Sequence, residues 1–221
     1  MTLELFWGSG SPYGWRVLLA LEYKGADYVS HQLQFSTRDH KKADYLKINP
    51  RGRLPALRDG DFILTESLAM LVYVDEKFPD PPLFPGGAQE RARIWEMISF
   101  CTSYFEPAAN WVVGAIRKGL FDSRRERVLR AIEDVHGELG ILEEALARRP
   151  WLACDRLSAA DLTCYPYLEF MLRMAAREAA KGLPLGLSPF GERYPRIAAW
   201  RERMRAIPGY ERAYPPHWRE G

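Results

Sequence analysis

The stretch LELFWGSGSPYGWRVLLALEYKGADYVSHQLQ, residues 3–34, decides the fold of the first part of the chain. Leu3–Trp7 is short, apolar and rich in strand-forming residues, and a run of glycine, serine and proline ends it. Trp15–Lys24 spaces its apolar residues as a helix does, after a serine–proline pair typical of a helix start. Tyr28–Gln34 alternates again as a strand. The pattern predicts a βαβ unit, in which two parallel strands are joined by a right-handed crossover.

The residues after this unit extend the same sheet. A short helix is expected over Ala43–Leu46, ahead of two short apolar runs that flank Asp59 and Gly60. Asp-Gly between apolar runs is a strong signal for a β-hairpin. Leu68–Phe78 then has the pattern of a helix. The predicted order of the first part is therefore β-α-β-α-β-β-α.

The rest of the chain has almost no two-residue alternation and is predicted to be helical. Prolines and glycines crowd residues 79–87 and indicate an extended linker. Apolar side chains recur at helical spacing in Glu90–Phe105, in a seam from Val128 to Leu146, and in Pro195–Ala206. A capping box is expected at Ser158–Asp161. The predicted organisation is an α/β domain over residues 1–80, a linker over 81–89, and an all-helical domain over 90–221.

Composition excludes several classes of protein. The chain has 221 residues, and its 31 basic and 29 acidic residues leave a net charge of only +2. A dedicated binder of nucleic acid or of a membrane surface needs a larger basic surplus. No apolar stretch approaches the ~20 residues that span a bilayer, and no secretory signal is visible. Cys101, Cys154 and Cys164 lie too far apart to suggest a disulfide framework or a metal site. We therefore expect a cytoplasmic protein with buried cysteines and no metal.

Three short motifs fall at the ends of predicted elements in the first domain. Ser11–Arg16 lies at a strand-to-helix junction, Arg53–Pro55 enters the hairpin, and Thr65–Leu68 starts another helix. In a β-α-β-α-β-β-α fold these loops can lie together on one edge of the sheet.

These motifs, with Asn49–Leu57, Glu66–Ala69 and Leu157–Leu162, make the whole chain resemble the cytosolic glutathione S-transferases. Trp15–Val17 is similar to the zeta class, and Ser11–Gly14 to the tau class and many bacterial members. The resemblance implies a thioredoxin-like first domain, a helical second domain, glutathione as co-substrate, a small-molecule electrophile as second substrate, and a homodimer.

The resemblance implies that Ser11 is the catalytic residue, a stabiliser of the glutathione thiolate. A thiol with a pKa near 8.5 is only slightly ionised at neutral pH, so its reactive form must be stabilised. A hydroxyl at a helix N-terminus does so through its hydrogen bond and the helix dipole. The alternatives are that Ser11 only caps the helix, or that Ser9 takes the role.

The other motifs are implied to hold glutathione along its length. A cis Leu54–Pro55 peptide presents backbone groups that pair with the cysteinyl part like an added strand. Glu66 and Ser67 receive the γ-glutamyl end. Candidates for the glycyl carboxylate are Arg53, His40 and Lys41. Ordinary structural roles remain open for each: an edge-strand proline, a plain helix cap, or solvated charges.

The second substrate is expected between the domains. The candidate wall residues are aromatic, and each alone is more typical of a core: Tyr13, Tyr104, Phe105, Trp111 and Tyr165. The aromatic tail that contains Tyr210, Tyr214 and Trp218 is expected to cap this pocket or to pack on the surface.

The favoured function is therefore transfer of glutathione to an electrophile or a peroxide. Neither Ser11 nor Gly14 is a cysteine, which excludes dithiol exchange at this position. Two alternatives remain open, a zeta-like cis-trans isomerase and a non-enzymatic protein that carries glutathione or a hydrophobic ligand.

Overall fold

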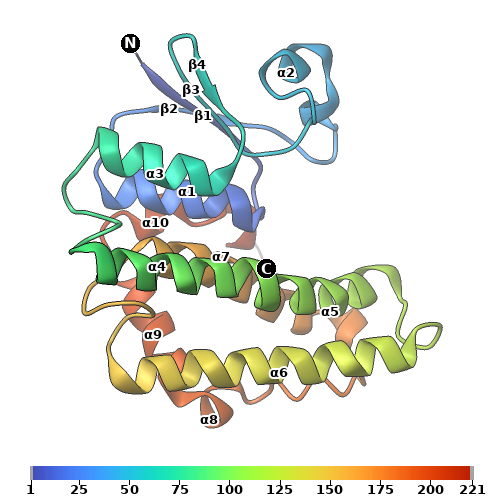
Figure 1. Cartoon of the computed structure of the whole chain (residues 1–221). Coiled ribbons are helices and arrows are strands. Elements are labelled where there is room, and N and C mark those ends of the chain that lie inside the picture. Colours follow the sequence, from blue (N-terminus) through green and yellow to red (C-terminus); the bar gives the residue numbers. More distant parts are fainter. Residues whose placement is uncertain (1, 220–221) are drawn as a thin grey trace. The chain divides into compact units, whose positions relative to one another are not determined.

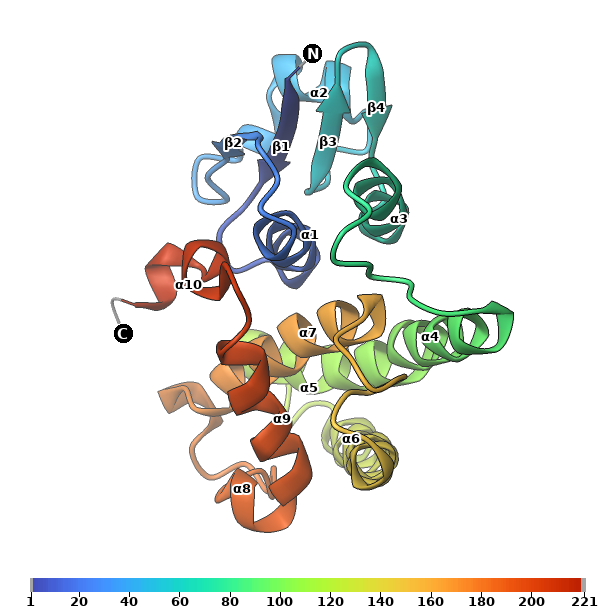
Figure 2. The same cartoon turned by 90° about the vertical axis from the view of Figure 1, so that its left-hand side faces the viewer.

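The structure of the protein is a computed structural model that describes residues 2–219. Within these residues the chain divides into two compact units. The first runs to Phe84 and resumes at Arg205, and the second is Pro85–Met204. Figure 1 labels the elements of both units, and Figure 2 shows them from the side.

A four-stranded sheet of order β2-β1-β3-β4 forms the centre of the first unit. β1 (Leu3–Trp7) pairs in parallel with β2 (Val29–Gln32) and antiparallel with β3 (Ala56–Asp59). β4 (Phe62–Leu64) closes the hairpin on β3. The parallel pair and the hairpin are thus both confirmed.

Helices cover the two faces of this sheet. α1 (Pro12–Tyr23) and α3 (Ser67–Lys77) pack side by side along one face (Figure 2). On the other face, Phe6 and Ala56 form a buried cluster with Tyr45 of α2 (Ala43–Ile48). Since side chains alternate across a strand, β1 fills both cores at once. The element order β-α-β-α-β-β-α and the thioredoxin-like arrangement are confirmed.

Residues 210–218 pack on α1 and belong to the first unit. The indole ring of Trp15 lies 6.2 Å from the ring of Tyr210 in α10 (Tyr210–Ala213) and 5.7 Å from that of Tyr214. Trp218, in the 3-10 turn η4 (Pro216–Trp218), is 5.2 Å from the same indole. The predicted boundary assigned this tail to the helical domain. Burial of its aromatic rings on Trp15 places it with the first unit instead.

The buried side chain of Lys24 binds both α3 and the segment that follows it. The Lys24 side chain is 0% exposed, and its Nζ lies 2.6 Å from Asp75 Oδ1 and 2.7 Å from the Pro81 carbonyl oxygen. Asp75 also accepts the Leu83 N–H at 2.7 Å. This network fixes the direction in which the chain leaves the first unit.

The second unit opens with one long, locally widened helix. α4 (Ala88–Phe100) passes through a π-helical turn, η2 (Cys101–Phe105), into α5 (Glu106–Lys118). At the widening, the Glu106 N–H donates to the Cys101 carbonyl five residues earlier. Pro107 follows directly; a proline has no N–H and crowds the preceding turn, which a π turn relieves. The predicted helix Glu90–Phe105 is confirmed, but it continues beyond its expected end.

The remaining elements are the turns η1 (Asp39–Lys41) and η3 (Glu178–Ala180) and the helices α6 (Arg125–Arg148), α7 (Ala159–Ala175), α8 (Phe190–Arg193) and α9 (Pro195–Arg205). The seam that begins at Val128 and ends at Leu146 is buried along α6. All three cysteines are buried and free, as expected. Among residues 2–219, no helix is both long enough and apolar enough to cross a membrane.

Candidate active site

Ser11 is the N-cap of α1, and its side chain is only loosely engaged. Its backbone is extended, at φ −78° and ψ 120°, and Pro12 follows at the first helical position. The Gly14 N–H donates to Ser11 Oγ at 3.4 Å, beyond the usual 2.7–3.2 Å range. Because Oγ acts only as an acceptor in this contact, its O–H remains available to donate to a bound group. Ser11 is half-buried, so such a group can reach it.

The turn before Ser11 brings the first two motifs together. The Ser11 N–H donates to the Gly8 carbonyl at 3.1 Å, and Gly10 within the turn has φ +81°. A Cβ atom on Gly8 would lie 2.5 Å from the Phe35 ring and 3.0 Å from Leu54 Cδ1. A side chain at Gly8 would have to displace the Phe35 ring, and the short distance to Leu54 shows that the Ser11 loop packs against the loop that contains Leu54.

Two buried polar side chains hold the loop before Pro55. The Leu54–Pro55 peptide is cis, as the resemblance implies. The Arg53 carbonyl accepts the Tyr45 hydroxyl at 2.6 Å and Asn49 Nδ2 at 2.8 Å. Within residues 2–219 no hydrogen bond engages the backbone N–H or C=O of Leu54, so both can pair with an added peptide. Sequence reasoning missed the positioning roles of Tyr45 and Asn49, although Asn49 lies inside the motif.

The segment with His40 and Lys41 packs on the same loop. Gly52 has φ +54°, and a Cβ there would lie 2.7 Å from the His40 carbonyl oxygen. Lys41 Nζ donates to the Arg51 carbonyl at 3.2 Å. Burial lowers the pKa of His40, and the positive charge of Lys41 lowers it further. Near pH 7 His40 is therefore neutral and can offer a hydrogen bond, whereas Lys41 and the exposed Arg53 offer charge.

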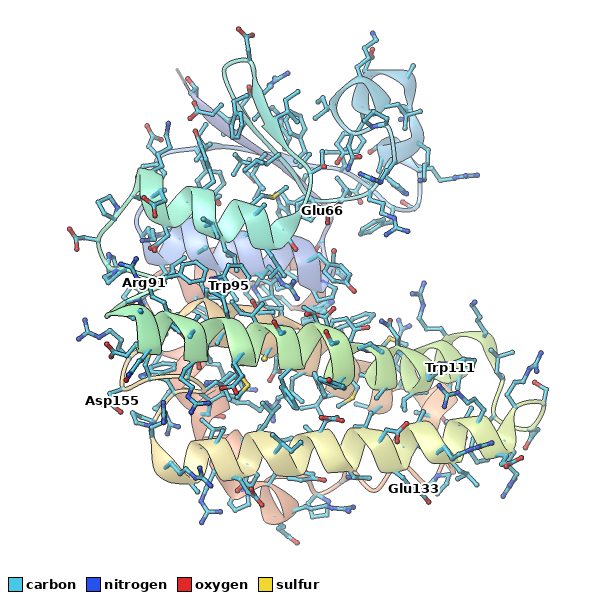
Figure 3. All side chains as sticks on the ribbon, in the orientation of Figure 1. Glu66, Arg91, Trp95, Trp111, Glu133 and Asp155 are labelled. Carbon is cyan, nitrogen blue, oxygen red and sulfur yellow. The ribbon has the colours of Figure 1, made fainter. Side chains whose placement is uncertain are left out.

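The third motif starts α3 and is linked to the first by a buried arginine. Glu66 is exposed at the N-cap and makes no side-chain cap bond (Figure 3). Ser67, the first helical residue, is 8% exposed. Arg16 is 1% exposed, and its Nη1 donates to Ser67 Oγ at 3.4 Å. Sequence reasoning missed this role of Arg16. A charged residue within the apolar run of α1 was the available signal.

The candidate aromatic wall divides into exposed and buried side chains. Tyr104 and Trp111 are 62% and 41% exposed in the helical unit, and Tyr13 of α1 is half-buried. Phe105 and Tyr165 are 0% exposed, which favours a packing role for both. The assignment of Tyr13, Tyr104 and Trp111 to a substrate wall stays a prediction.

The three motifs of the first unit offer groups suited to a peptide and to anions. They supply two helix N-termini, the buried guanidinium of Arg16 and the backbone groups of Leu54, which make no hydrogen bond within residues 2–219. Within the described residues, no group of three or more His, Cys, Asp or Glu side chains could hold a metal ion.

Comparison with known proteins assigns this site to a family. The sequence model described as "Glutathione S-transferase, N-terminal domain" matches residues 10–77, and that described as "Glutathione S-transferase, C-terminal domain" matches residues 91–203. The chain is 28% identical to glutathione S-transferase A of Pleuronectes platessa, covering 99% of this chain and 93% of the relative. It is 32% identical to human glutathione S-transferase theta-2, covering 98% and 86%.

Solved structures agree with these relatives. A glutathione S-transferase from the Antarctic clam Laternula elliptica superposes with a TM-score of 0.83 at 28% identity, covering all of this chain and 95% of that one. The relatives carry names of several classes, among them theta and zeta. The chain therefore belongs to the glutathione S-transferase family and is a glutathione transferase enzyme, with glutathione as its co-substrate.

Proposed function

We propose that this transferase is of the serine type, with Ser11 holding the glutathione sulfur as a thiolate. The thiolate then forms a C–S bond with an electrophilic carbon while a leaving group such as halide departs. With a hydroperoxide it takes the terminal oxygen, the O–O bond breaks and the alcohol is released; a second glutathione then converts the resulting sulfenic acid into glutathione disulfide and water. Ser11 acts as a hydrogen-bond donor and not as a nucleophile, so it forms no bond to the substrate.

The observation that carries this proposal is the incomplete cap of α1. The Gly14 N–H reaches Ser11 Oγ only at 3.4 Å, and the side chain is half-buried. The hydroxyl proton and the helix N-terminus are therefore both open to an anion. Together they favour the ionised form of a bound thiol and lower its pKa.

The remaining contacts suit the rest of glutathione. The open backbone groups of Leu54 suit the cysteinyl peptide. Ser67 suits the γ-glutamyl carboxylate, because Arg16 donates to its Oγ and leaves its O–H to donate to the ligand. The exposed Glu66 carboxylate suits the ammonium group of the same end. Arg53 and Lys41 supply positive charge for the glycyl carboxylate, and neutral His40 supplies a hydrogen bond.

A pH titration of bound glutathione tests the role of Ser11. The ultraviolet absorbance of the thiolate is followed as pH is scanned, in wild type and in Ser11→Ala. We expect the bound thiol to ionise well below its free pKa of about 8.5 in wild type. In Ser11→Ala its pKa should return towards that value, because the donor is lost.

Ser11→Thr is the matched control, since it retains a hydroxyl and a good N-cap. It should preserve part of the shift. An unshifted pKa in wild type, or an Ser11→Ala variant that behaves like wild type, would refute the assignment of Ser11. Turnover with an aryl halide and with an organic hydroperoxide then separates conjugation from peroxide reduction.

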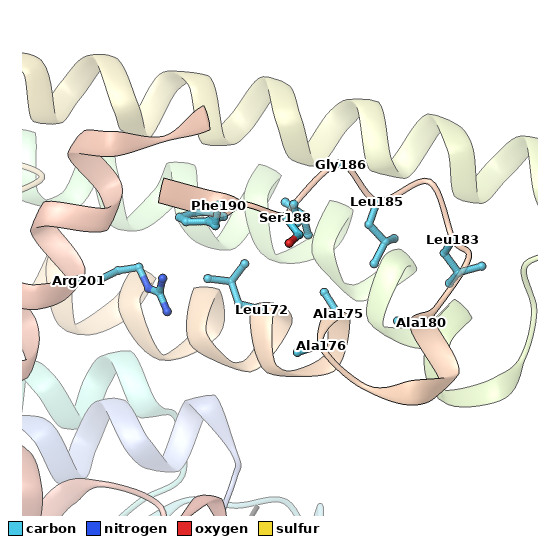
Figure 4. A pocket seen from close by; sticks show the side chains of 11 residues that line it. Leu172, Ala175, Ala176, Ala180, Leu183, Leu185, Gly186, Ser188, Phe190 and Arg201 are labelled. Carbon is cyan, nitrogen blue, oxygen red and sulfur yellow. The ribbon is translucent and has the colours of Figure 1, made fainter. Parts of the chain in front are cut away.

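A cavity in the helical unit favours a second, additional function, the carriage of an apolar ligand. It encloses about 550 Å³ between α7, α9 and residues 183–190. Figure 4 shows Arg201 and Phe190 near one end of it and Leu183 near the other. Glu169 pairs with Arg201 through both carboxylate oxygens, so the charge of this lining side chain is neutralised. The cavity therefore suits an uncharged apolar molecule.

Filling the cavity tests this second function. The uncharged dye Nile red should gain fluorescence with wild type and lose that gain with Ala175→Trp, because Ala175 lines the cavity. Ala179→Trp is the control, since Ala179 is exposed on the neighbouring η3 turn outside the lining. Equal dye binding by both variants would locate the dye elsewhere and reject the proposal.

We further propose that the enzyme is a cytoplasmic homodimer. The proposal follows the resemblance stated above and is tested by sedimentation, which should give twice the chain mass of 25.4 kDa. A mass equal to one chain at micromolar concentration would reject it.

A further inference from the structure

A histidine from the far end of the chain lies on the turn that precedes Ser11. His217 Nδ1 is 2.6 Å from Ser9 Oγ, although 208 residues separate the two. His217 belongs to the short turn η4, and its side chain is exposed. A distance of 2.6 Å lies at the short end of the hydrogen-bond range.

The same imidazole also packs on the backbone of that turn. A Cβ atom on Gly10 would lie 2.6 Å from His217 Cε1 and 3.0 Å from His217 Nε2. It would also lie 3.2 Å from Trp218 Nε1. Glycine is favoured at position 10 for two reasons: the backbone has a φ of +81°, and the tail lies too close for a side chain. A glycine-containing turn has more conformational freedom than others, so an external contact has more freedom to restrict.

The tail is anchored on both sides of Ser11. His217 contacts the two residues before it, and Trp218 and Tyr214 contact Trp15, about one helical turn after it. Trp15 and Trp218 are 1% and 8% exposed, so this packing is well buried. Because the neighbouring Trp218 is buried against Trp15, the backbone that carries His217 is held in place.

We propose that His217 is a positioning residue for Ser11. Through Ser9 and Gly10 it holds the Gly8–Ser11 turn, and so sets the direction in which the Ser11 hydroxyl donates to the glutathione sulfur. This inference rests on the proposed function of Ser11. It assigns His217 no contact with glutathione, so its loss should lower kcat and leave the KM for glutathione nearly unchanged.

The experiment combines the thiolate titration with steady-state kinetics on His217→Ala, Ser9→Ala and the double variant. Each single variant should lower kcat about 3- to 10-fold, as expected for one lost hydrogen bond, and raise the pKa of the bound thiol. The double variant should be no worse than either single one, because both remove the same contact. His217→Asn should keep most of the activity, since its amide places a polar atom near the position of Nδ1.

Arg212→Ala is the matched control on the same tail. Arg212 pairs with Glu22, away from the turn, and should leave kcat and the thiol pKa at wild-type values. Additive losses in the double variant would overturn the inference. So would an Asn variant as poor as the Ala variant, or losses that merely follow a lowered Tm.

The two proposals fail in different ways. If Ser11→Ala leaves the pKa of bound glutathione unchanged, the serine-type assignment is wrong and the inference about His217 falls with it. If Ser11→Ala raises that pKa but His217→Ala does not, only the positioning role of His217 is refuted.

Discussion

α1 and α7 each have a serine at the N-cap, and the two caps are built differently. Ser158, at the N-cap of α7, is 0% exposed, and both its N–H and its hydroxyl donate to Asp161 Oδ2 at 3.0 Å. Ser11, at the N-cap of α1, is half-buried and accepts one long bond from Gly14. The first cap is complete and closed, and the second is incomplete and open.

Asp161 shows how completely the first cap is closed. It is fully buried, and its other oxygen accepts the Leu152 N–H at 3.0 Å and Trp200 Nε1 at 2.9 Å. Burial raises the pKa of Asp161, while these bonds favour its ionised form. A cap with every donor satisfied can only stabilise the fold. A cap that leaves a hydroxyl proton unused, as at Ser11, can serve a ligand.

The largest expected loss of stability comes from removing Asp161, the acceptor of the closed cap. Asp161→Ala leaves buried N–H and O–H donors in the helical unit without an acceptor. Because each unsatisfied buried donor costs about 1–3 kcal/mol, we expect a loss of about 3–5 kcal/mol in the free energy of unfolding. Chemical denaturation followed by circular dichroism measures it. A loss below 1 kcal/mol would contradict the view that the cap at Ser158 is a closed, stabilising one.

Removing the open cap should lower activity strongly and stability only slightly. Ser11→Ala should lower kcat/KM at neutral pH by about 100-fold, the size seen when one donor to a developing anion is removed. The rate should recover as pH rises towards the pKa of free glutathione, because the unassisted thiol then ionises in solution. A pH–rate profile measures this, and an unchanged profile would refute it.

The stability of the two serine variants sharpens the contrast. Ser158→Ala should lower the free energy of unfolding by about 1–2 kcal/mol, because it removes a fully buried hydrogen bond to a carboxylate. Ser11→Ala should lower it by about 0.5 kcal/mol or less, because its cap bond is long. Parallel denaturation curves compare the variants directly. The reverse order would show that Ser11 is the structural cap.

The smallest effect on stability is expected at the third helix start. Glu66, the N-cap of α3, is exposed and makes no cap bond. Glu66→Gln should therefore change the free energy of unfolding by less than about 0.5 kcal/mol. It should nevertheless raise the KM for glutathione about 10-fold, as expected for loss of a charge-assisted hydrogen bond. An unchanged KM would remove Glu66 from the binding site.

Much of the first unit could be predicted because its signals are local. The Asp59-Gly60 turn, the Ser11-Pro12 helix start and the alternating strands each depend on residues within a few positions. The closed cap was also predictable, since Ser158 and Asp161 lie three residues apart. These predictions are confirmed because local conformational preference and the tertiary fold agree at these sites.

Several of the missed features join residues that are distant in the sequence. Arg16 contacts Ser67 across 51 positions, and Lys24 binds the carbonyl oxygen of Pro81 across 57. The π-helical turn before Pro107 depends on how a proline is accommodated within a packed helix. No periodicity or motif spacing reports such contacts.

The sequence by itself determined the order of elements, the family and the candidate binding motifs, because each is encoded in short stretches of residues. Only the tertiary structure decided which unit the tail joins and what it touches. His217 reaches Ser9 because the aromatic rings of the tail are buried against Trp15. That choice depends on which apolar surface remains uncovered after folding, and burial of apolar surface is non-directional and leaves no local trace in the sequence.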